Sequence, residues 1–458
     1  MKITRGILVA LLVSVVACKD ITSSYNIPNH DNPSIDQLTG NPTPSVIAAT
    51  AQGLFESMRS ETEAQINEPA HFGREGYYLA AARTVLNEFD DPLTPSSTGN
   101  TGWNTAYSGI RTINSLVHAL DVVSGMSDSD KAAVRGFAET LEAYLLHSQL
   151  RIHDTFGIPI DTDRDPNGPL AAIASKADAF KYIADRLDAA VADLQQAGAA
   201  FPFNLPPGFA GFDTPDKFIE FNRALRARVA VEMQDYQGAL QALSSSFLEP
   251  DGNLDLGVYD SYSTAGGDRT NPYYDPVGLK YLADTMIVVD AQRKANGDID
   301  DRVTRKVAQV PYITHTGVTS DLQWKWISTP TTPLPVIRNE ELILIRAEAR
   351  MFTGDRAGAI DDLNRIRVRS GGLVPLSGDP GDPGLLDELL YNRRYSLVFE
   401  YGHRWVDLRR FGRLHDLVGP RGAGDRVFDK VPFPASECDA RNNKPAGCGQ
   451  VNGFRTTS

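Results

Sequence analysis

Acidic, basic and imidazole side chains alternate near the C-terminus, and they are the first candidates for chemistry in this sequence. Glu400, His403, Arg404, Asp407 and Arg410 lie within one short stretch. Carboxylates, guanidiniums and imidazoles are the groups that general acid–base catalysis uses. The sequence has no nucleophile elbow, phosphate-binding loop or zinc-protease motif beside them. We therefore interpret the cluster as ion pairs and caps that join neighbouring helices, and we expect no enzymatic activity.

Aromatic side chains with polar neighbours gather in two segments that predict a binding site. Sugar recognition combines aromatic faces, which cover the apolar faces of the sugar, with polar groups that bond its hydroxyls. Trp324 and Trp326 alternate as on a strand, so they are predicted to point the same way and to form a platform. Each ring could equally well serve packing or contact with a partner protein. The candidate ligand-binding residues are Trp324, Trp326, Tyr273 and Tyr274 in one segment, and Tyr77, Tyr78 and Asp90 in the other.

Three alternating aspartates, Asp161, Asp163 and Asp165, resemble the start of a calcium-binding loop. Pro166 stands where the loop needs a glycine, and Ala172 stands where it needs a bidentate glutamate. An EF-hand is therefore excluded, and a solvated turn is the preferred interpretation. Another calcium geometry stays open, but we expect no metal and no cofactor.

The N-terminus predicts export and lipid attachment. Lys2 and Arg5 precede an apolar stretch that ends at Ala17, and the stretch is shorter than the ~20 residues that a membrane-spanning helix needs. Cys18 follows directly, as in a bacterial lipobox, where the acylated cysteine becomes the new N-terminus. An ordinary secretory signal followed by an unrelated cysteine is the alternative. We expect Cys18 to carry the lipid anchor.

The charge of the chain is acidic, and its cysteines are few. The full sequence has a formal net charge of −13, which becomes −15 when residues 1–17 are removed, because they hold two basic residues and no carboxylate. Such a surface repels phosphate backbones, so a nucleic-acid partner is not expected. Of the three cysteines, Cys438 and Cys448 lie close together in the tail. In an exported protein they are predicted to form a disulfide.

Apolar residues at helical spacing dominate most of the chain, and two segments repeat one another. Helical stripes run through residues 46–66, 103–123, 130–156 and 175–197. The letters LRA at 225–227 precede DYQGAL at 235–240 at the same spacing that IRA at 345–347 precedes DRAGAI at 355–360. Both predict a helix, a tight turn and a second helix capped by an aspartate, as in tetratricopeptide units. Two unrelated antiparallel helix pairs are the alternative.

Changes in residue composition and in helical periodicity divide the chain into five parts. Glycine, proline, tyrosine and threonine replace the helical stripes between the two repeats, except at residues 279–294, and such irregular regions often carry binding residues. The parts are a signal peptide at 1–17, a tether at 18–44, a helical repeat region at 45–246, a loop-rich insertion at 247–337 and C-terminal helical repeats with a tail at 338–458.

The segment RRYSLVFEYGHRWVDLRRFG at residues 393–412 resembles the C-terminal pattern of the RagB/SusD family of outer-membrane nutrient-binding lipoproteins. Asn392 stands where an acidic residue is usual in that family, and Tyr401 is an additional residue before Gly402. Further similar features are the lipobox, the motif WNTAYSGIRTIN at 103–114, the motif NEELILIRAEA at 339–349 and the ending VPFPASE at 431–437. Together these features span nearly the whole mature chain.

The resemblance implies an all-α fold, in which tetratricopeptide-like helix pairs form a right-handed superhelix and an irregular, loop-rich insertion carries the ligand site. It also implies a lipid-anchored protein of the outer membrane that faces the cell exterior. The implied partner is a SusC-like TonB-dependent transporter, to which the protein delivers an oligosaccharide. A peptide ligand, or a structural surface protein without a small ligand, are the alternatives that the resemblance leaves open.

Overall fold

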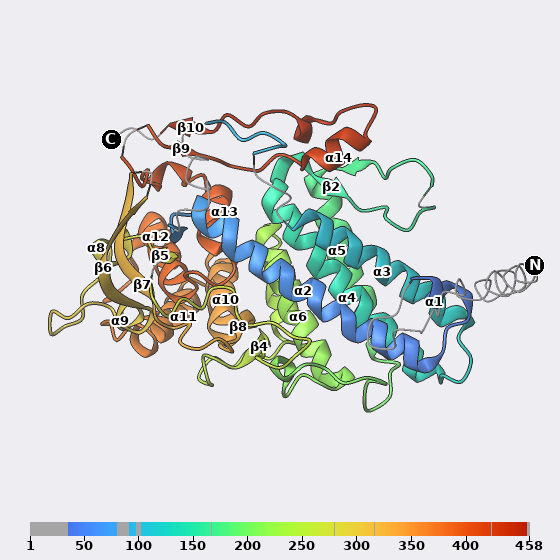
Figure 1. The fold of residues 1–458 in the computed structure, drawn as a ribbon. Helices are drawn as coiled ribbons and strands as arrows, with labels where there is room; N and C mark the ends of the chain where they lie inside the picture. Colours follow the sequence, from blue (N-terminus) through green and yellow to red (C-terminus); the bar gives the residue numbers. More distant parts are fainter. Residues whose placement is uncertain are drawn as a thin grey trace, which may run out of the picture.

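The chain folds into stacked helices with a small sheet at one end (Figure 1). The computed structural model describes residues 35–79, 91–97, 102–165, 167–278, 280–315, 317–422 and 424–455. Cys18 and Asp90 lie outside these residues. Among the described residues, no helix has both the length and the apolar composition that crossing a membrane requires.

The longest helix, α2 (Pro44–Phe72), runs diagonally through the molecule from α1 (Ile35–Gly40) to α13 (His403–Arg410) (Figure 1). Its start is set by Thr43, whose hydroxyl accepts a hydrogen bond from the backbone N–H of Val46 at 3.4 Å, and by a proline in the first turn. Both N- and C-terminal helices pack on α2, so it connects the two ends of the core.

Three helices that the periodicity predicts follow α2. Serines cap two of them: Ser127 accepts from the N–H of Asp130, and Ser175 accepts from the N–H of Asp178, each at 3.1 Å. The last turn of the second helix leads into a short two-stranded ladder. The elements are α3 (Trp103–Val122), α4 (Asp128–His153), β2 (Ile158–Pro159), β3 (Ile173–Ala174) and α5 (Lys176–Leu194).

The two repeated segments fold as helix pairs, as the sequence predicts. They are α6 (Pro215–Glu232) with α7 (Tyr236–Leu243), and α10 (Asn339–Thr353) with α11 (Arg356–Arg369). Asp235 accepts from the N–H of Gly238, and Asp355 accepts from the N–H of Gly358, both at 2.9 Å. The pairs stack through α7 and α10, where the rings of Tyr236 and Phe352 lie 4.5 Å apart. The all-α, tetratricopeptide-like fold is confirmed.

The insertion is more regular than the sequence suggests, because it builds most of an antiparallel sheet in the order β1-β5-β7-β6. β1 (Gly76–Tyr78) comes from the segment after α2 and pairs with β5, so this strand has its partner far along the chain. The other elements are β4 (Gly257–Asp260), β5 (Tyr281–Ala283), α8 (Met286–Val289), α9 (Asp301–Lys306), β6 (Val307–His315), β7 (Val318–Trp324) and β8 (Leu334–Arg338), which pairs with β4.

The helical stripe at residues 279–294 is not one helix. Its first part is strand β5, and only a single turn, α8, follows. The pairing of β5 with β1 and the bond from the Asp284 N–H to the carbonyl of Glu75, at 2.9 Å, hold the segment extended. Partners distant in sequence thus override the local preference for helix.

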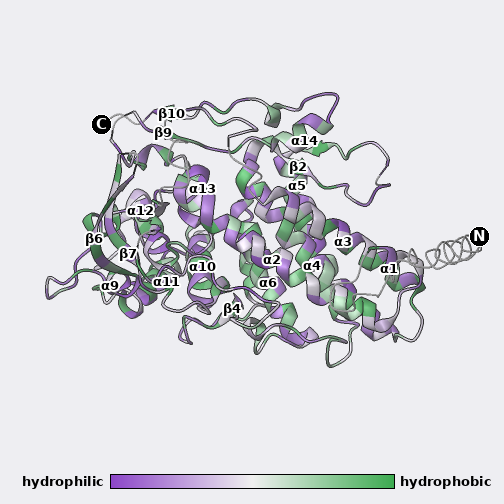
Figure 2. Ribbon diagram, viewed as in Figure 1, coloured by the Kyte–Doolittle hydropathy of each residue, from purple (hydrophilic) through white to green (hydrophobic). Residues whose placement is uncertain are grey.

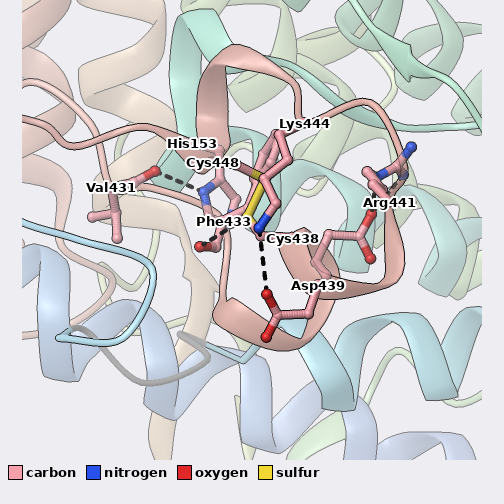
Figure 3. Close-up of a disulfide and its surroundings, with 9 residues drawn as sticks. His153, Val431, Phe433, Cys438, Asp439, Arg441, Lys444 and Cys448 are labelled. Carbon is pink, nitrogen blue, oxygen red and sulfur yellow. Dashed lines mark hydrogen bonds and ion pairs between the residues drawn. A yellow bond between two sulfur atoms is a disulfide. The ribbon is translucent and has the colours of Figure 1, made fainter.

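The C-terminal tail covers the ends of α3 and α4 (Figure 1). Cys438 and Cys448 form a disulfide within it. Figure 3 shows the imidazole of His153 beneath this loop, where its Nδ1 lies 2.9 Å from the carbonyl oxygen of Val431. The last elements are α12 (Gly381–Ser396), α13, β9 (Arg426–Val427), α14 (Ala435–Ala440) and β10 (Phe454–Arg455).

Apolar residues alternate with polar ones along the helices (Figure 2), and the apolar stripes meet in the core. Trp103 and Trp405 are both buried in it. Single turns of 3-10 helix join several elements; they are η2 (Asp154–Phe156), η3 (Pro207–Phe209), η4 (Leu414–Asp416) and η5 (Ala446–Cys448).

Candidate functional site

The charged cluster that opens α13 joins helices. Asp407 accepts from Arg393 of α12 at 2.6 Å and from Arg410 at 3.0 Å, and Arg410 also pairs with Glu348 of α10. Arg404 donates to the backbone carbonyls of the turn that follows α2. These side chains are engaged in contacts between helices, which supports the structural interpretation.

A second group of charges ties α9, β8 and the end of α12 together. Glu400 accepts from Arg338 at 2.9 Å and from Lys306 at 2.8 Å, and Arg338 also bonds Glu340. Burial alone would raise the pKa of Glu340, but the charge of Arg338 holds this pKa down at about 2. A glutamate bound in this way is a permanent anion and a poor proton carrier.

His403 lies in a buried setting rich in cations. Its ring is buried, and burial together with the neighbouring guanidiniums of Arg151 and Arg228 lowers its pKa well below 6.5. Both guanidiniums lie over the ring of Tyr401, at 4.5 and 4.7 Å from its centroid. The additional tyrosine of the family-like motif therefore serves as a packing surface for two buried arginines.

The two segments with candidate aromatic residues meet in the sheet. Strand β1 pairs with β5, so that Tyr77 lies opposite Leu282 and Tyr78 lies opposite Tyr281. The rings of Tyr78 and Tyr281 contact each other edge to face, with centroids 4.8 Å apart. Tyr281 in turn contacts Tyr273, with ring centroids 5.0 Å apart. The structure thus brings residues from both predicted segments into one aromatic cluster.

Three of the predicted ligand-binding residues are packing residues. Trp324 is only 3% exposed and stacks on Phe399, with ring centroids 4.6 Å apart. Tyr273 is buried and donates to the carbonyl of Glu63, and Tyr77 is buried and donates to Asp284, both at 2.5 Å. A ring that is covered on its face cannot also cover a sugar, so these three do not form an exposed platform.

Tyr78, Tyr274 and Tyr281 form the half-exposed rim of this aromatic cluster, and we refer to them as the tyrosine rim. The position of Tyr281 is set by the carboxylate of Asp275, which accepts from the backbone N–H groups of Gly278 at 3.1 Å, Lys280 at 2.7 Å and Tyr281 at 3.2 Å. These bonds and the pairing of β5 with β1 place the ring of Tyr281 beside Tyr78. The segment that contains Asp90 begins just after Leu79 and lies outside the described residues.

Strand β7 ends at Trp324, so Trp326 lies beyond the strand, where it packs against the same apolar cluster that contains Trp324. It is half-buried and lines a cavity of 670 Å³ together with Tyr259 and Thr332. The basic walls of this cavity, which include Arg305 and Arg338, bond to neighbouring protein groups. The predicted pair of tryptophans thus separates into a core residue and a cavity residue.

Neither Tyr281 of the tyrosine rim nor Tyr259 of the cavity is among the residues that the sequence predicts for ligand binding. Both lie in short strands, where too few residues alternate to reveal which side chains are exposed. The one available signal for Tyr281 is its position just after Gly278, in a segment with turn residues on its N-terminal side. Its role depends on pairing with a strand about two hundred residues earlier.

The three aspartates at 161–165 lie in a solvent-facing loop. Asp163 contacts the imidazole of His118 at 2.9 Å, and Asp161 accepts from Arg164 at 2.6 Å. Across the described ranges of the chain, no three or more histidine, cysteine, aspartate or glutamate side chains gather in a way that would hold a metal ion.

The fold consists of stacked tetratricopeptide-like helix pairs with an inserted sheet, and this combination defines the structural class of the protein. The model of the SusD family matches residues 294–451, and no curated protein matches the sequence. Residues 294–451 are therefore similar to the SusD family, and the solved structures described next share the fold of most of the chain.

Solved structures of similar fold cover most of the chain. A SusD superfamily protein from Bacteroides vulgatus is 17% identical, with a TM-score of 0.63, over 86% of this chain and 98% of that one. A SusD-like protein from Bacteroides fragilis is 16% identical, with a TM-score of 0.64, over 91% and 100%. Surface glycan-binding protein A from Bacteroides thetaiotaomicron, in complex with laminarihexaose, is 14% identical, with a TM-score of 0.66, over 90% and 100%.

Proposed function

We propose that this protein is a lipid-anchored, surface-exposed protein of the outer membrane that binds an oligosaccharide. The observation that carries the proposal is the fold, which is shared along nearly the full length with a surface glycan-binding protein that was solved with laminarihexaose. Cys18 would hold the lipid, as the lipobox-like start of the sequence indicates. The acidic surface suits a soluble domain that is held beside, and not inside, the membrane.

The tyrosine rim is the proposed contact for the sugar chain. Tyr78 and Tyr281 are held edge to face on paired strands, so their exposed parts make a pre-formed apolar surface. The half-buried Tyr274 adjoins the same cluster. Phenol hydroxyls at the border of such a surface can bond sugar hydroxyls while the rings cover the apolar faces of the sugar.

Delivery of the bound sugar to a SusC-like TonB-dependent transporter completes the proposed function. The exposed face of the stacked helix pairs is the kind of extended surface that repeat proteins use for protein contacts. Solubilising native membranes gently, capturing the protein and identifying the bound proteins by mass spectrometry tests this step. A stoichiometric barrel transporter is expected, and its absence in several detergents would support a purely structural surface protein.

Removing the tyrosine rim should weaken sugar binding. In the double variant Tyr78→Ala/Tyr281→Ala we expect affinity for the best-binding oligosaccharide to fall about ten-fold or more, because central aromatic contacts carry most of the binding energy. Isothermal titration calorimetry with laminarihexaose, maltohexaose, cellohexaose and xylohexaose measures this change.

Tyr312→Ala is the matched control, because Tyr312 is a tyrosine of the same sheet that is 74% exposed and lies on β6. Its affinity should equal that of the unmodified protein. Equal affinities of the double variant and the control would show that the tyrosine rim is not part of the binding site. Binding of peptides in place of all four sugars would identify a peptide-binding member of the family.

A further inference from the structure

A second cavity, separate from the tyrosine rim, lies between α2, α3 and β4. Its volume is 880 Å³, and Gln52, Asn104, Ser108, Phe209 and Asp260 are among its lining residues. The turn that carries Phe209 forms one wall, and the loop after β4 forms another.

Two glycines give this cavity its shape. A Cβ atom on Gly109 would lie 2.9 Å from the Ser57 hydroxyl, so only glycine allows α3 to approach α2 this closely. A Cβ on Gly208 would lie 1.8 Å from the carbonyl oxygen of Tyr259. The wall at Phe209 is therefore pressed directly against β4, and the cavity is a built feature of the fold.

One buried carboxylate oxygen in this cavity lacks a partner. Asp260 is 5% exposed, and among the described residues its Oδ2 atom has no hydrogen bond. Burial raises the pKa of Asp260 to about 7, while the nearby hydroxyl of Thr62 acts in the opposite direction. An unpartnered buried acceptor is costly, and a ligand that donates a hydrogen bond to it would recover that cost.

The other charges of the cavity are already paired. Arg59 bonds Asp268 at 2.7 Å and also pairs with Glu56, which Arg269 contacts at 2.9 Å. These carboxylates and guanidiniums compensate one another, so a highly charged ligand finds no opposite excess of charge. A neutral ligand with many hydroxyl groups suits the lining better.

The neutral lining offers both kinds of contact that a sugar needs. Asn104 and Ser108 are exposed on one side of α3, and Gln52 is exposed on the facing side of α2. The rings of Phe55 and Phe209 lie behind them, with centroids 5.1 Å apart. Amide and hydroxyl groups can thus bond a sugar unit above an apolar floor.

We propose that this cavity is a second sugar subsite, in which a hydroxyl of one sugar unit donates to Oδ2 of Asp260 while Asn104 and Ser108 bond neighbouring hydroxyls. The proposal rests on the proposed glycan-binding function, and it adds a binding position away from the tyrosine rim. A sugar chain that occupies both positions would bind more tightly than the rim alone allows.

Protection of a thiol in the cavity tests this subsite. In the full chain with Cys18→Ser, the substitution Ser108→Cys adds the one thiol outside the Cys438–Cys448 disulfide. We expect saturating laminarihexaose, maltohexaose, cellohexaose or xylohexaose, whichever binds, to slow its alkylation by iodoacetamide several-fold. Ser124→Cys, exposed just beyond the end of α3, is the control and should react at an unchanged rate.

The role of Asp260 is tested by titration calorimetry. Asp260→Ala should weaken binding about ten-fold or more, since it removes the proposed hydrogen bond to the buried carboxyl oxygen. Circular dichroism shows whether this variant folds. Ser108→Trp, which fills the cavity from an exposed position, should also weaken sugar binding about ten-fold or more, and it alters no buried residue.

The outcomes separate the two proposals. A sugar that binds the unmodified chain but leaves the alkylation rate at position 108 unchanged overturns the cavity subsite and leaves glycan binding intact. Failure of all four sugars to bind the unmodified chain overturns both proposals for these sugars. Protection of the thiol at position 108 that persists when Tyr78→Ala/Tyr281→Ala is added, and disappears when Asp260→Ala is added, supports a separate site.

Discussion

At the scale of single residues, the neighbours of a side chain decide its role. Trp324 and Tyr281 are both aromatic residues of the inserted sheet. Phe399 covers the first, whereas the second stays half-exposed beside Tyr78. The same holds for carboxylates: Glu340 is held as an anion by Arg338, whereas Glu61 is buried without a cation among the groups that act on its pKa.

Glu61 should make stability depend on pH. Burial raises its pKa from 4.5 to about 8, although Ser148 and Gln149 donate hydrogen bonds to it, each at 2.7 Å. The folded protein therefore holds a proton that the unfolded chain releases near pH 4.5. Its contribution to stability is fully present below pH 4.5 and is lost as the pH rises through about 8.

Urea denaturation at pH 5, 6.5 and 8 measures this dependence. The unfolding free energy should fall by roughly 1–3 kcal/mol less between pH 5 and pH 8 in Glu61→Gln than in the unmodified protein, because glutamine cannot ionise. Asp361→Asn, an exposed residue of α11, should leave the decline as it is. Equal slopes for Glu61→Gln and the unmodified protein would show that Glu61 does not cause the effect.

At the scale of elements, the helix pairs depend on their turns. Each repeated turn places one residue in the left-handed region, Gln234 at φ 64° and Gly354 at φ 92°, directly before the capping aspartate. The cap then accepts from the third residue of the next helix. The residue in the left-handed region thus ends one helix, and the capping aspartate begins the next.

Loss of a cap should destabilise the fold measurably. Asp355→Ala is expected to lower the unfolding free energy by about 1 kcal/mol, since it removes the bond to the N–H of Gly358. Asp355→Asn should retain most of the stability, because asparagine is also a good cap. Chemical denaturation compares the two, and equal losses in both would point to the ion pair with Arg350 instead.

At the scale of the whole molecule, segments distant in sequence hold the C-terminal tail in place. Leu93 and Val451 form an isolated antiparallel bridge, and the N–H of Val431 donates to the carbonyl of Ile152 at 3.1 Å. The Cys438–Cys448 disulfide closes a loop in this tail (Figure 3). The tail is therefore part of the packed structure around α3 and α4.

Breaking the disulfide should loosen this tail. Cys438→Ala/Cys448→Ala is expected to lower the unfolding free energy by about 2–3 kcal/mol on the chain-entropy argument for a short loop. A reducing agent should lower the melting temperature of the unmodified protein and leave that of the double variant unchanged. If reduction leaves the melting temperature of the unmodified protein unchanged, the tail is held by its packing alone.

The sequence by itself determined the features that depend on neighbouring residues. Helical periodicity, the caps at Asp235 and Asp355, and the repeat of two helix pairs are local patterns, and apart from the stripe at residues 279–294 they have the predicted form in the structure. The family resemblance at residues 393–412 lies within the segment that the SusD family model matches. Short-range interactions fix such features before distant parts of the chain meet.

Only the tertiary structure decided which aromatic residues face solvent. The pairing of β1 with β5 places Tyr78 beside Tyr281, and the packing of Phe399 removes Trp324 from the surface. The cavity at Asp260 likewise requires α2, α3 and β4 to meet. Burial is a sum over contacts between segments far apart in sequence, so no window of neighbouring residues contains it.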